Sequence, residues 1–241
     1  MSSNHIYFDQ PLDSQMLTLH SRWLFVPHTC AVLYVAKRNQ HLMRSSNPTS
    51  HGFQPLPEVL KGHKYVSPYE PPQSTNPFVF QFGYTGTIDN APPLCVSTAL
   101  KFRELVCGGE KTIQNYCQIL AKHGEQRAVE ILETCTLTIP ETKRVAFANV
   151  RLPLEFTSSA TANGDHSIPL TEIQAVVDFL LKGLAQNYST FVNVAFISGS
   201  LWARFSAMIY LEMDDFEHGA TALKELCRKV KNKEYVLPKR L

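Results

Sequence analysis

Two short segments of the chain carry groups that could do chemistry at neutral pH. His51 lies in Ser50-His51-Gly52, and a histidine can donate or accept a proton near pH 7. Gly86-Thr87 offers a hydroxyl and free backbone N–H groups in a turn, which is an arrangement that binds phosphate. A hydrogen-bonded loop histidine and an ordinary turn at the end of a strand are the alternatives. The residues alone favour the ordinary turn, because glycine is common in turns.

The motifs of several common enzyme classes are missing. The sequence has no G-x-G-x-x-G, no P-loop, no H-E-x-x-H, no G-x-S-x-G and no Cys/His cluster with zinc spacing. An acidic cluster lies at the start of the last predicted helix, where carboxylates stabilise the positive end of the helix dipole. We therefore interpret it as a helix start rather than a metal site, and we expect no metal. Its members are Glu212, Asp214, Asp215 and Glu217.

Composition indicates a globular protein. The 241 residues are 44% hydrophobic and 18% charged, which suits one large domain or two small ones. The net charge of +2 is too small to indicate a basic surface that binds nucleic acid. None of the six cysteines forms a C-x-x-C pair, and that pattern suits a reducing compartment. Because neither a secretory signal nor a membrane-length apolar run is visible, we expect a cytoplasmic protein with no membrane partner.

The elements that would position these groups differ between the two halves. The first half predicts short strands, a helix and a long Pro-rich loop; the pair Gly108-Gly109 then indicates a domain boundary, giving domains 1–108 and 109–241. The second half predicts a small α+β domain whose sheet is covered on one face. The predicted strands are 24–36, 78–82, 145–152, 191–197 and 202–211, the helices are 92–106, 110–132, 171–187 and 213–230, and the loop is 44–77.

The clearest helix is the one predicted over 171–187. Apolar residues recur along it with i, i+3, i+4 spacing, so one face can pack against a sheet. Thr171 and Gln174 have the spacing of a capping box at its start.

In this order, the segments resemble the fold-type I pyridoxal-phosphate enzymes of aminotransferase class V. Within that family they are most similar to the fungal isopenicillin-N-epimerase-like or hercynylcysteine-sulfoxide-lyase-like branch. The resemblance runs from about Leu17 onward, and it implies an α/β fold: a remnant of the large cofactor domain followed by the class V C-terminal small domain. It is carried by Trp23-Leu24-Phe25-Val26-Pro27, Lys37-Arg38-Asn39-Gln40-His41-Leu42, Thr49-Ser50-His51-Gly52-Phe53, Gly86-Thr87-Ile88-Asp89-Asn90, Lys101-Phe102-Arg103-Glu104 and Arg204-Phe205-Ser206.

The resemblance also implies roles for particular residues. Gly86 and Thr87 match a turn that binds the cofactor phosphate of a partner subunit. Arg204, in the segment that continues to Ser206 and Tyr210, matches an arginine that binds the substrate α-carboxylate as a bidentate fork, although a plain surface arginine is the alternative. His51 and Tyr84 match positions in the active cleft.

At one position the chain departs from the family pattern. The family places a lysine directly before the tryptophan, where it holds pyridoxal phosphate as a Schiff base, and this chain has Arg22 there. A guanidinium stays protonated and is a poor nucleophile, so arginine cannot replace that amine. The resemblance further implies that much of the cofactor domain is missing. We therefore expect that no cofactor binds and that the phosphate turn at Gly86-Thr87 is vestigial. We also expect that the surface normally covered by the missing part is buried instead in a homodimer or in a heterodimer with a full-length relative.

These features predict a repurposed enzyme that works without pyridoxal phosphate. Arg22, His51 and Tyr84 would be its catalytic residues, and Arg204 would bind a small-molecule substrate. Isomerisation, cyclisation or lyase chemistry in fungal secondary metabolism would fit. The alternatives are a non-catalytic partner subunit or pseudoenzyme, an inactive product, and an ordinary pyridoxal-phosphate lyase or aminotransferase.

Overall fold

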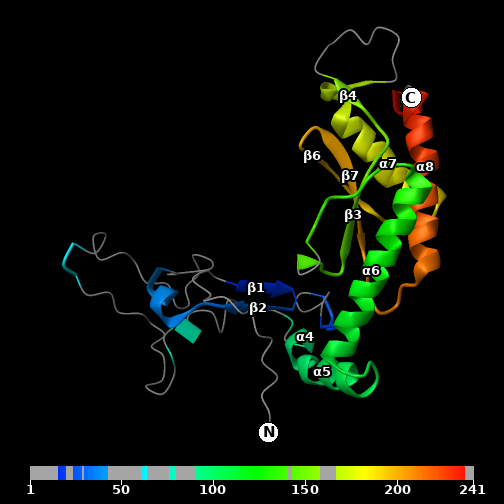
Figure 1. The fold of residues 1–241 in the computed structure, drawn as a ribbon. Coiled ribbons are helices and arrows are strands. Elements are labelled where there is room, and N and C mark those ends of the chain that lie inside the picture. Colours follow the sequence, from blue (N-terminus) through cyan, green and yellow to red (C-terminus); the bar gives the residue numbers. More distant parts are fainter. Residues whose placement is uncertain are drawn as a thin grey trace. The chain divides into compact units, whose positions relative to one another are not determined.

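The computed structural model describes residues 16–19, 24–28, 30–42, 61–63, 76, 78–79, 89, 91–140, 143–157 and 167–236 (Figure 1). The chain divides into two compact units, Met1–Val106 and Cys107–Leu241, and the division falls beside Gly108-Gly109. Helices and strands occur in both units. The predicted α/β fold class is therefore confirmed.

The described residues of the first unit include a two-stranded antiparallel pair, a 3-10 helix and two short α-helices. Leu19 lies opposite Ala31 in the pair, and Met16 lies opposite Tyr34. The predicted strand over 24–36 is wrong in its first half, because only its last part pairs with another strand. The elements are β1 (Met16–Leu19), β2 (Ala31–Tyr34), the 3-10 helix η1 (Lys37–Leu42), α4 (Ala91–Leu94) and α5 (Val96–Leu105).

A second prediction fails at Phe78 and Val79, which are helical rather than extended. The side-chain oxygen of Asn76 accepts a hydrogen bond from the Phe78 backbone N–H at 2.9 Å. This is the bond that an N-cap residue makes at the start of a helix. Local capping therefore outweighs the β propensity of the aromatic and branched residues that follow.

The small core of the first unit includes an unusual contact between Phe25 and Arg103. Phe25 has a φ of 63°, a conformation that bulky residues rarely adopt. The guanidinium carbon of Arg103, whose side chain is buried, lies 4.6 Å from the centre of the Phe25 ring. A cation over an aromatic face is attracted by the ring quadrupole. This contact therefore helps to hold the sharp backbone turn at Phe25.

The second unit is built around a three-stranded antiparallel sheet in the order β3-β7-β6. A short parallel pair, β4-β5, lies apart from that sheet in the hydrogen-bonding pattern. The strands are β3 (Phe147–Arg151), β4 (Phe156–Thr157), β5 (Ile168–Pro169), β6 (Asn193–Ile197) and β7 (Ser200–Ser206). The helices are α6 (Glu110–Leu132), η3 (Leu170–Glu172), α7 (Ile173–Asn187), α8 (Met213–Lys231) and η4 (Glu234–Val236).

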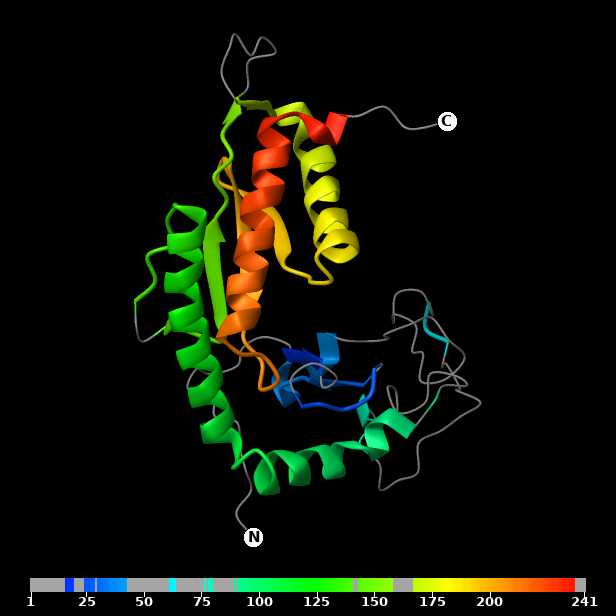
Figure 2. The same cartoon turned by 90° about the vertical axis from the view of Figure 1, so that its right-hand side faces the viewer.

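Three long helices cover one face of this sheet, as the sequence predicts. Helix α6 packs on β3, α7 packs on β6, and α8 packs against both α6 and α7. Figures 1 and 2 show all three on the same side of the strands. The side chains that point into this layer are almost fully buried, and they include Ala148, Val150, Leu201, Ala203 and Phe205.

The hairpin between β6 and β7 turns through Ser198 and Gly199. Both residues have positive φ values, 49° and 81°, which is the conformation of a two-residue type I′ turn. This turn pairs Ile197 with Ser200, so β7 begins two residues earlier than predicted. The strand also ends earlier, at Ser206 rather than at residue 211, because its last partner on β3 is Phe147.

Of the two helix starts predicted from the sequence in this unit, that of α8 forms as expected and that of α7 does not. The predicted capping box of Thr171 and Gln174 does not form, because η3 precedes α7 and Gln174 donates instead to Asp178 at 2.9 Å. The acidic cluster does form a cap: the Asp215 carboxylate accepts from the Glu212 N–H at 2.8 Å at the start of α8. That cluster is therefore part of a helix start, as interpreted from the sequence.

A buried carboxylate joins α6 to the segment before β3. Glu125 is only 2% exposed, and its carboxylate lies 2.7 Å from the Arg144 guanidinium. The Thr136 hydroxyl donates a hydrogen bond to the other carboxylate oxygen. A buried charge is tolerated when it is paired and hydrogen-bonded in this way. The pair therefore holds the chain between α6 and β3 against the helix.

We expect Arg144→Ala to destabilise the second unit substantially, because it leaves the Glu125 charge buried without its cation. Removing one partner of a buried pair costs about 3 kcal/mol or more. The free energy of unfolding in urea measures this. Arg127→Ala is the matched control, because Arg127 pairs with Glu217 at 2.7 Å on the surface. Equal losses in the two variants would show that the Glu125 pair has no special role.

We also expect Gly124→Ala to destabilise the protein, although alanine favours helices. A Cβ at Gly124 would lie 2.1 Å from Cδ1 of the Phe216 ring on α8. Overpacking of this kind costs about 1–3 kcal/mol, which exceeds the roughly 1 kcal/mol gained in helix propensity. Thermal unfolding is the measurement. The double change Gly124→Ala with Phe216→Leu should be more stable than Gly124→Ala alone, whereas a stabilised single variant would contradict this packing.

Candidate functional site

Only one of the residues predicted to form the site lies among the residues that the structure describes. Arg22, His51, Tyr84, Gly86 and Thr87 lie outside the described residues. Arg204 lies within them, on β7. The geometry of the site is therefore built from Arg204 outward.

Arg204 is exposed on the sheet face that the helices leave uncovered. Its neighbours Ala203 and Phe205 point to the opposite face and are buried, because side chains alternate along a strand. Since β7 is the central strand, Arg204 has a partner on each side: Asn149 on β3 and Asn193 on β6. Directly opposed side chains begin about 5 Å apart. The Arg204 side chain therefore leaves the sheet between those of Asn149 and Asn193.

An aromatic ring supports the guanidinium from the same face. The guanidinium carbon of Arg204 lies 5.1 Å from the centre of the Phe147 ring. This contact favours one orientation of a long, flexible side chain. We call Arg204, Asn149, Asn193 and Phe147 the Arg204 site.

The Arg204 site is suited to bind a carboxylate. Arg204 forms no ion pair with any residue in the described part of the chain. A guanidinium offers N–H donors in a fork that matches the two oxygens of a carboxylate. Each asparagine adds an NH₂ donor and a carbonyl acceptor. Groups of these kinds can bind and orient an anion.

The two other residues of the resembling segment lie differently. Ser206 is partly exposed on the same face as Arg204, two residues along β7. Tyr210 lies beyond the strand and is 72% exposed. Asn149 and Asn193 were not singled out from the sequence. They could have been found from the sequence, because each is a polar residue that alternates with the apolar, inward-facing residues of its predicted strand.

Two kinds of feature are absent from the described residues. No helix there is long and apolar enough to cross a membrane. No group of three or more His, Cys, Asp or Glu residues in those segments is placed to hold a metal ion.

Comparisons with known proteins find relatives from two fungi. No family model matches it. It is 39% identical over 229 residues to L-cysteine desulfhydrase-like protein lolT2 of Epichloe uncinata, and 37% identical over 225 residues to lolT1 of the same organism. It is 31% identical over 212 residues to hercynylcysteine sulfoxide lyase of Schizosaccharomyces pombe. The chain is a homologue of these proteins.

Each alignment covers 88% of this chain but between 45% and 50% of the relative. The chain thus spans about half the length of the curated relatives it matches. The likeness to a hercynylcysteine sulfoxide lyase, which the sequence motifs indicated, is confirmed at the level of homology.

Truncating a side chain should reduce the free energy of unfolding much less on the exposed face of β7 than on its buried face. Arg204→Ala should change the free energy of unfolding by less than about 1 kcal/mol, because an exposed side chain loses few contacts. Phe205→Ala should cost about 3–5 kcal/mol, because the ring is 5% exposed and stacks on Phe216 at 5.7 Å. Urea unfolding of both variants is the measurement. A large loss for Arg204→Ala would mean that the side chain supports the fold.

Proposed function

We propose that the chain acts as a lyase-type protein on a small, cysteine-derived carboxylate, and that the Arg204 site binds the carboxylate. The observation that carries this proposal is the exposed guanidinium of Arg204, opposed by Asn149 and Asn193 and supported by the Phe147 ring. The relatives support the substrate class, since one is named a cysteine desulfhydrase-like protein and another a hercynylcysteine sulfoxide lyase.

Pyridoxal phosphate is the cofactor that the class V resemblance implies, and the residues present do not fit it. When bound by a lysine amine, this cofactor supplies an electron sink for cleavage next to an amino acid α-carbon. The sequence has arginine at position 22, where the resemblance places that lysine. Such lysines are normally desolvated so that the amine is neutral. All the lysines in the described segments are at least partly exposed.

We therefore propose a reaction that uses only acid–base groups of the protein. Arg204 would neutralise the substrate carboxylate, which makes loss of the neighbouring C–H proton easier. His51 would take that proton, the C–S bond would break as the double bond forms, and Tyr84 would protonate the departing sulfur. Arg22 would stabilise negative charge as it develops. The same groups would also serve an isomerisation or a cyclisation of such a substrate.

The direct test separates this reaction from its alternatives. The purified chain is incubated with L-cysteine or with S-methyl-L-cysteine sulfoxide, with and without added pyridoxal phosphate, and release of the sulfur product is measured. The chain is then treated with borohydride and its intact mass is determined. The proposal predicts turnover without the cofactor and no lysine adduct.

Two outcomes would overturn the proposal. Turnover only with pyridoxal phosphate, together with one adduct on a single lysine, would establish a cofactor-dependent lyase. No turnover under either condition would favour a non-catalytic partner subunit or an inactive product.

Arg204→Met should weaken substrate binding specifically. Loss of a charge-assisted pair is worth about 1.5–3 kcal/mol, which corresponds to a roughly tenfold to hundredfold rise in KM. Arg204→Lys should recover part of this loss, because an ammonium keeps the charge but not the fork. The matched control is Arg228→Met, which removes an arginine that is 64% exposed on α8. An unchanged KM in Arg204→Met would remove Arg204 from the substrate site.

A further inference from the structure

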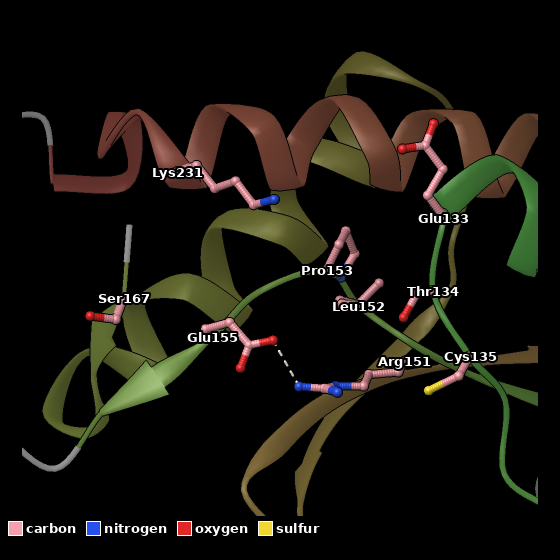
Figure 3. Close-up of a pocket in the computed structure, with 9 residues that line it drawn as sticks. All are labelled: Glu133, Thr134, Cys135, Arg151, Leu152, Pro153, Glu155, Ser167 and Lys231. Atoms are coloured by element: carbon pink, nitrogen blue, oxygen red, sulfur yellow. Dashed lines mark hydrogen bonds and ion pairs between the residues drawn. The ribbon is translucent and has the colours of Figure 1, made fainter. Parts of the chain in front are cut away.

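A cavity in the Cys107–Leu241 unit is lined by charged groups that the proposed function does not use. Its volume is about 590 Å³, a size typical of small-ligand pockets. It lies where α6 ends, beside the end of β3 and the last turn of α8 (Figure 3). It shares no residue with the Arg204 site. We call it the β3-end cavity.

The first pair of charges in the β3-end cavity comes from β3 and the loop that follows it. The Arg151 guanidinium lies 2.9 Å from the Glu155 carboxylate. The Arg151 side chain is 33% exposed and that of Glu155 is 73% exposed, so both remain accessible from the cavity. Only one nitrogen of Arg151 forms this pair, which leaves further N–H donors for a ligand.

The second pair of charges comes from the ends of the two helices. Glu133 follows α6, and Lys231 is the last residue of α8. The Lys224 ammonium, 2.7 Å from Glu133, lowers the pKa of that carboxyl, and Lys231 lowers it further by a smaller amount. Glu133 is therefore ionised at neutral pH. Within the described ranges Lys231 itself forms no ion pair.

Two cations and two carboxylates from four segments thus line one small cavity. Figure 3 shows the Arg151–Glu155 pair on one side, with Glu133 and Lys231 coming from the helix ends on the other. A simple anion would meet Lys231 and Arg151 but would be repelled by Glu155, whereas the charge of Glu133 is already compensated by Lys224. A simple cation would be attracted by Glu155 but repelled by Lys231 and Arg151. A molecule that carries both charges a short distance apart can pair with Lys231 and Arg151 through its anionic group and with Glu155 through its cationic group.

We propose that the β3-end cavity binds a small α-amino acid in its zwitterionic form. The ligand carboxylate pairs with Lys231 and the remaining donors of Arg151. The ligand ammonium pairs with the exposed carboxylate of Glu155. The site is separate from the one proposed for the reaction, and the proposal does not depend on that reaction.

Cys135 gives a direct readout of occupancy, because it lines the cavity and is exposed. Its position is fixed by its carbonyl, which accepts a hydrogen bond from the Arg151 N–H at 2.9 Å. Cys30, Cys117 and Cys227 are buried, and burial raises the pKa of Cys227 to about 12, so these thiols react slowly. The rate of alkylation at Cys135 by iodoacetamide can be followed by mass spectrometry of its peptide.

The probe is S-methyl-L-cysteine, which carries both charges and no free thiol. We expect it to slow alkylation of Cys135 in a saturable manner. Its N-acetyl derivative lacks the ammonium and its methyl ester lacks the carboxylate, so neither should protect at the same concentration. Calorimetric titration of the three compounds, with the same order of affinity, provides a measurement independent of the thiol.

Lys231→Met should weaken protection by about tenfold, the change that corresponds to loss of one charge-assisted contact. The matched control is Lys229→Met on the same turn of α8, since Lys229 pairs with Glu225 and does not line the cavity. Equal protection by all three compounds, an unchanged response in Lys231→Met, or binding heat without protection of Cys135 would each overturn the proposal.

Discussion

The register of the β6–β7 hairpin determines which side chains of the sheet are buried and which remain accessible. The turn at Ser198 and Gly199 fixes that register, and α6, α7 and α8 bury every second residue of the strands. A slip by one residue would exchange the two faces. It would place Arg204 under the helices and expose Phe205. The binding properties of the sheet therefore follow from a two-residue turn and from the apolar faces of three helices.

Strand β3 contributes residues to both sites, and these residues lie on the same face of the strand. Asn149 lies opposite Arg204, and Arg151, two residues later, lines the β3-end cavity. The segment after α6 is held beside β3 by the buried pair of Glu125 and Arg144. This pairing keeps Cys135 next to Arg151. One strand and one buried ion pair thus connect the stability of the unit to the geometry of both candidate sites.

The sequence predicted the helices of the second unit well, because each carries its own apolar period. Helix α6 has the predicted bounds, and α8 differs by one residue. The strands were harder, since β7 takes its limits from its partners rather than from its own residues. Asn149 and Asn193 were missed for the same reason: they are 44 residues apart in sequence and meet only across Arg204. The role of Arg204 stays a prediction, taken from a family resemblance.

We propose that Arg204 and its two asparagines bind one carboxylate together. Isotope-labelled NMR can test this directly by following the Arg204 guanidinium N–H signal and the Asn149 and Asn193 side-chain NH₂ signals during titration with S-methyl-L-cysteine sulfoxide. We expect all three signals to shift with one shared midpoint, and the ester of the same compound to cause no shift. Absence of a shift at Arg204, or different midpoints at the asparagines, would contradict it.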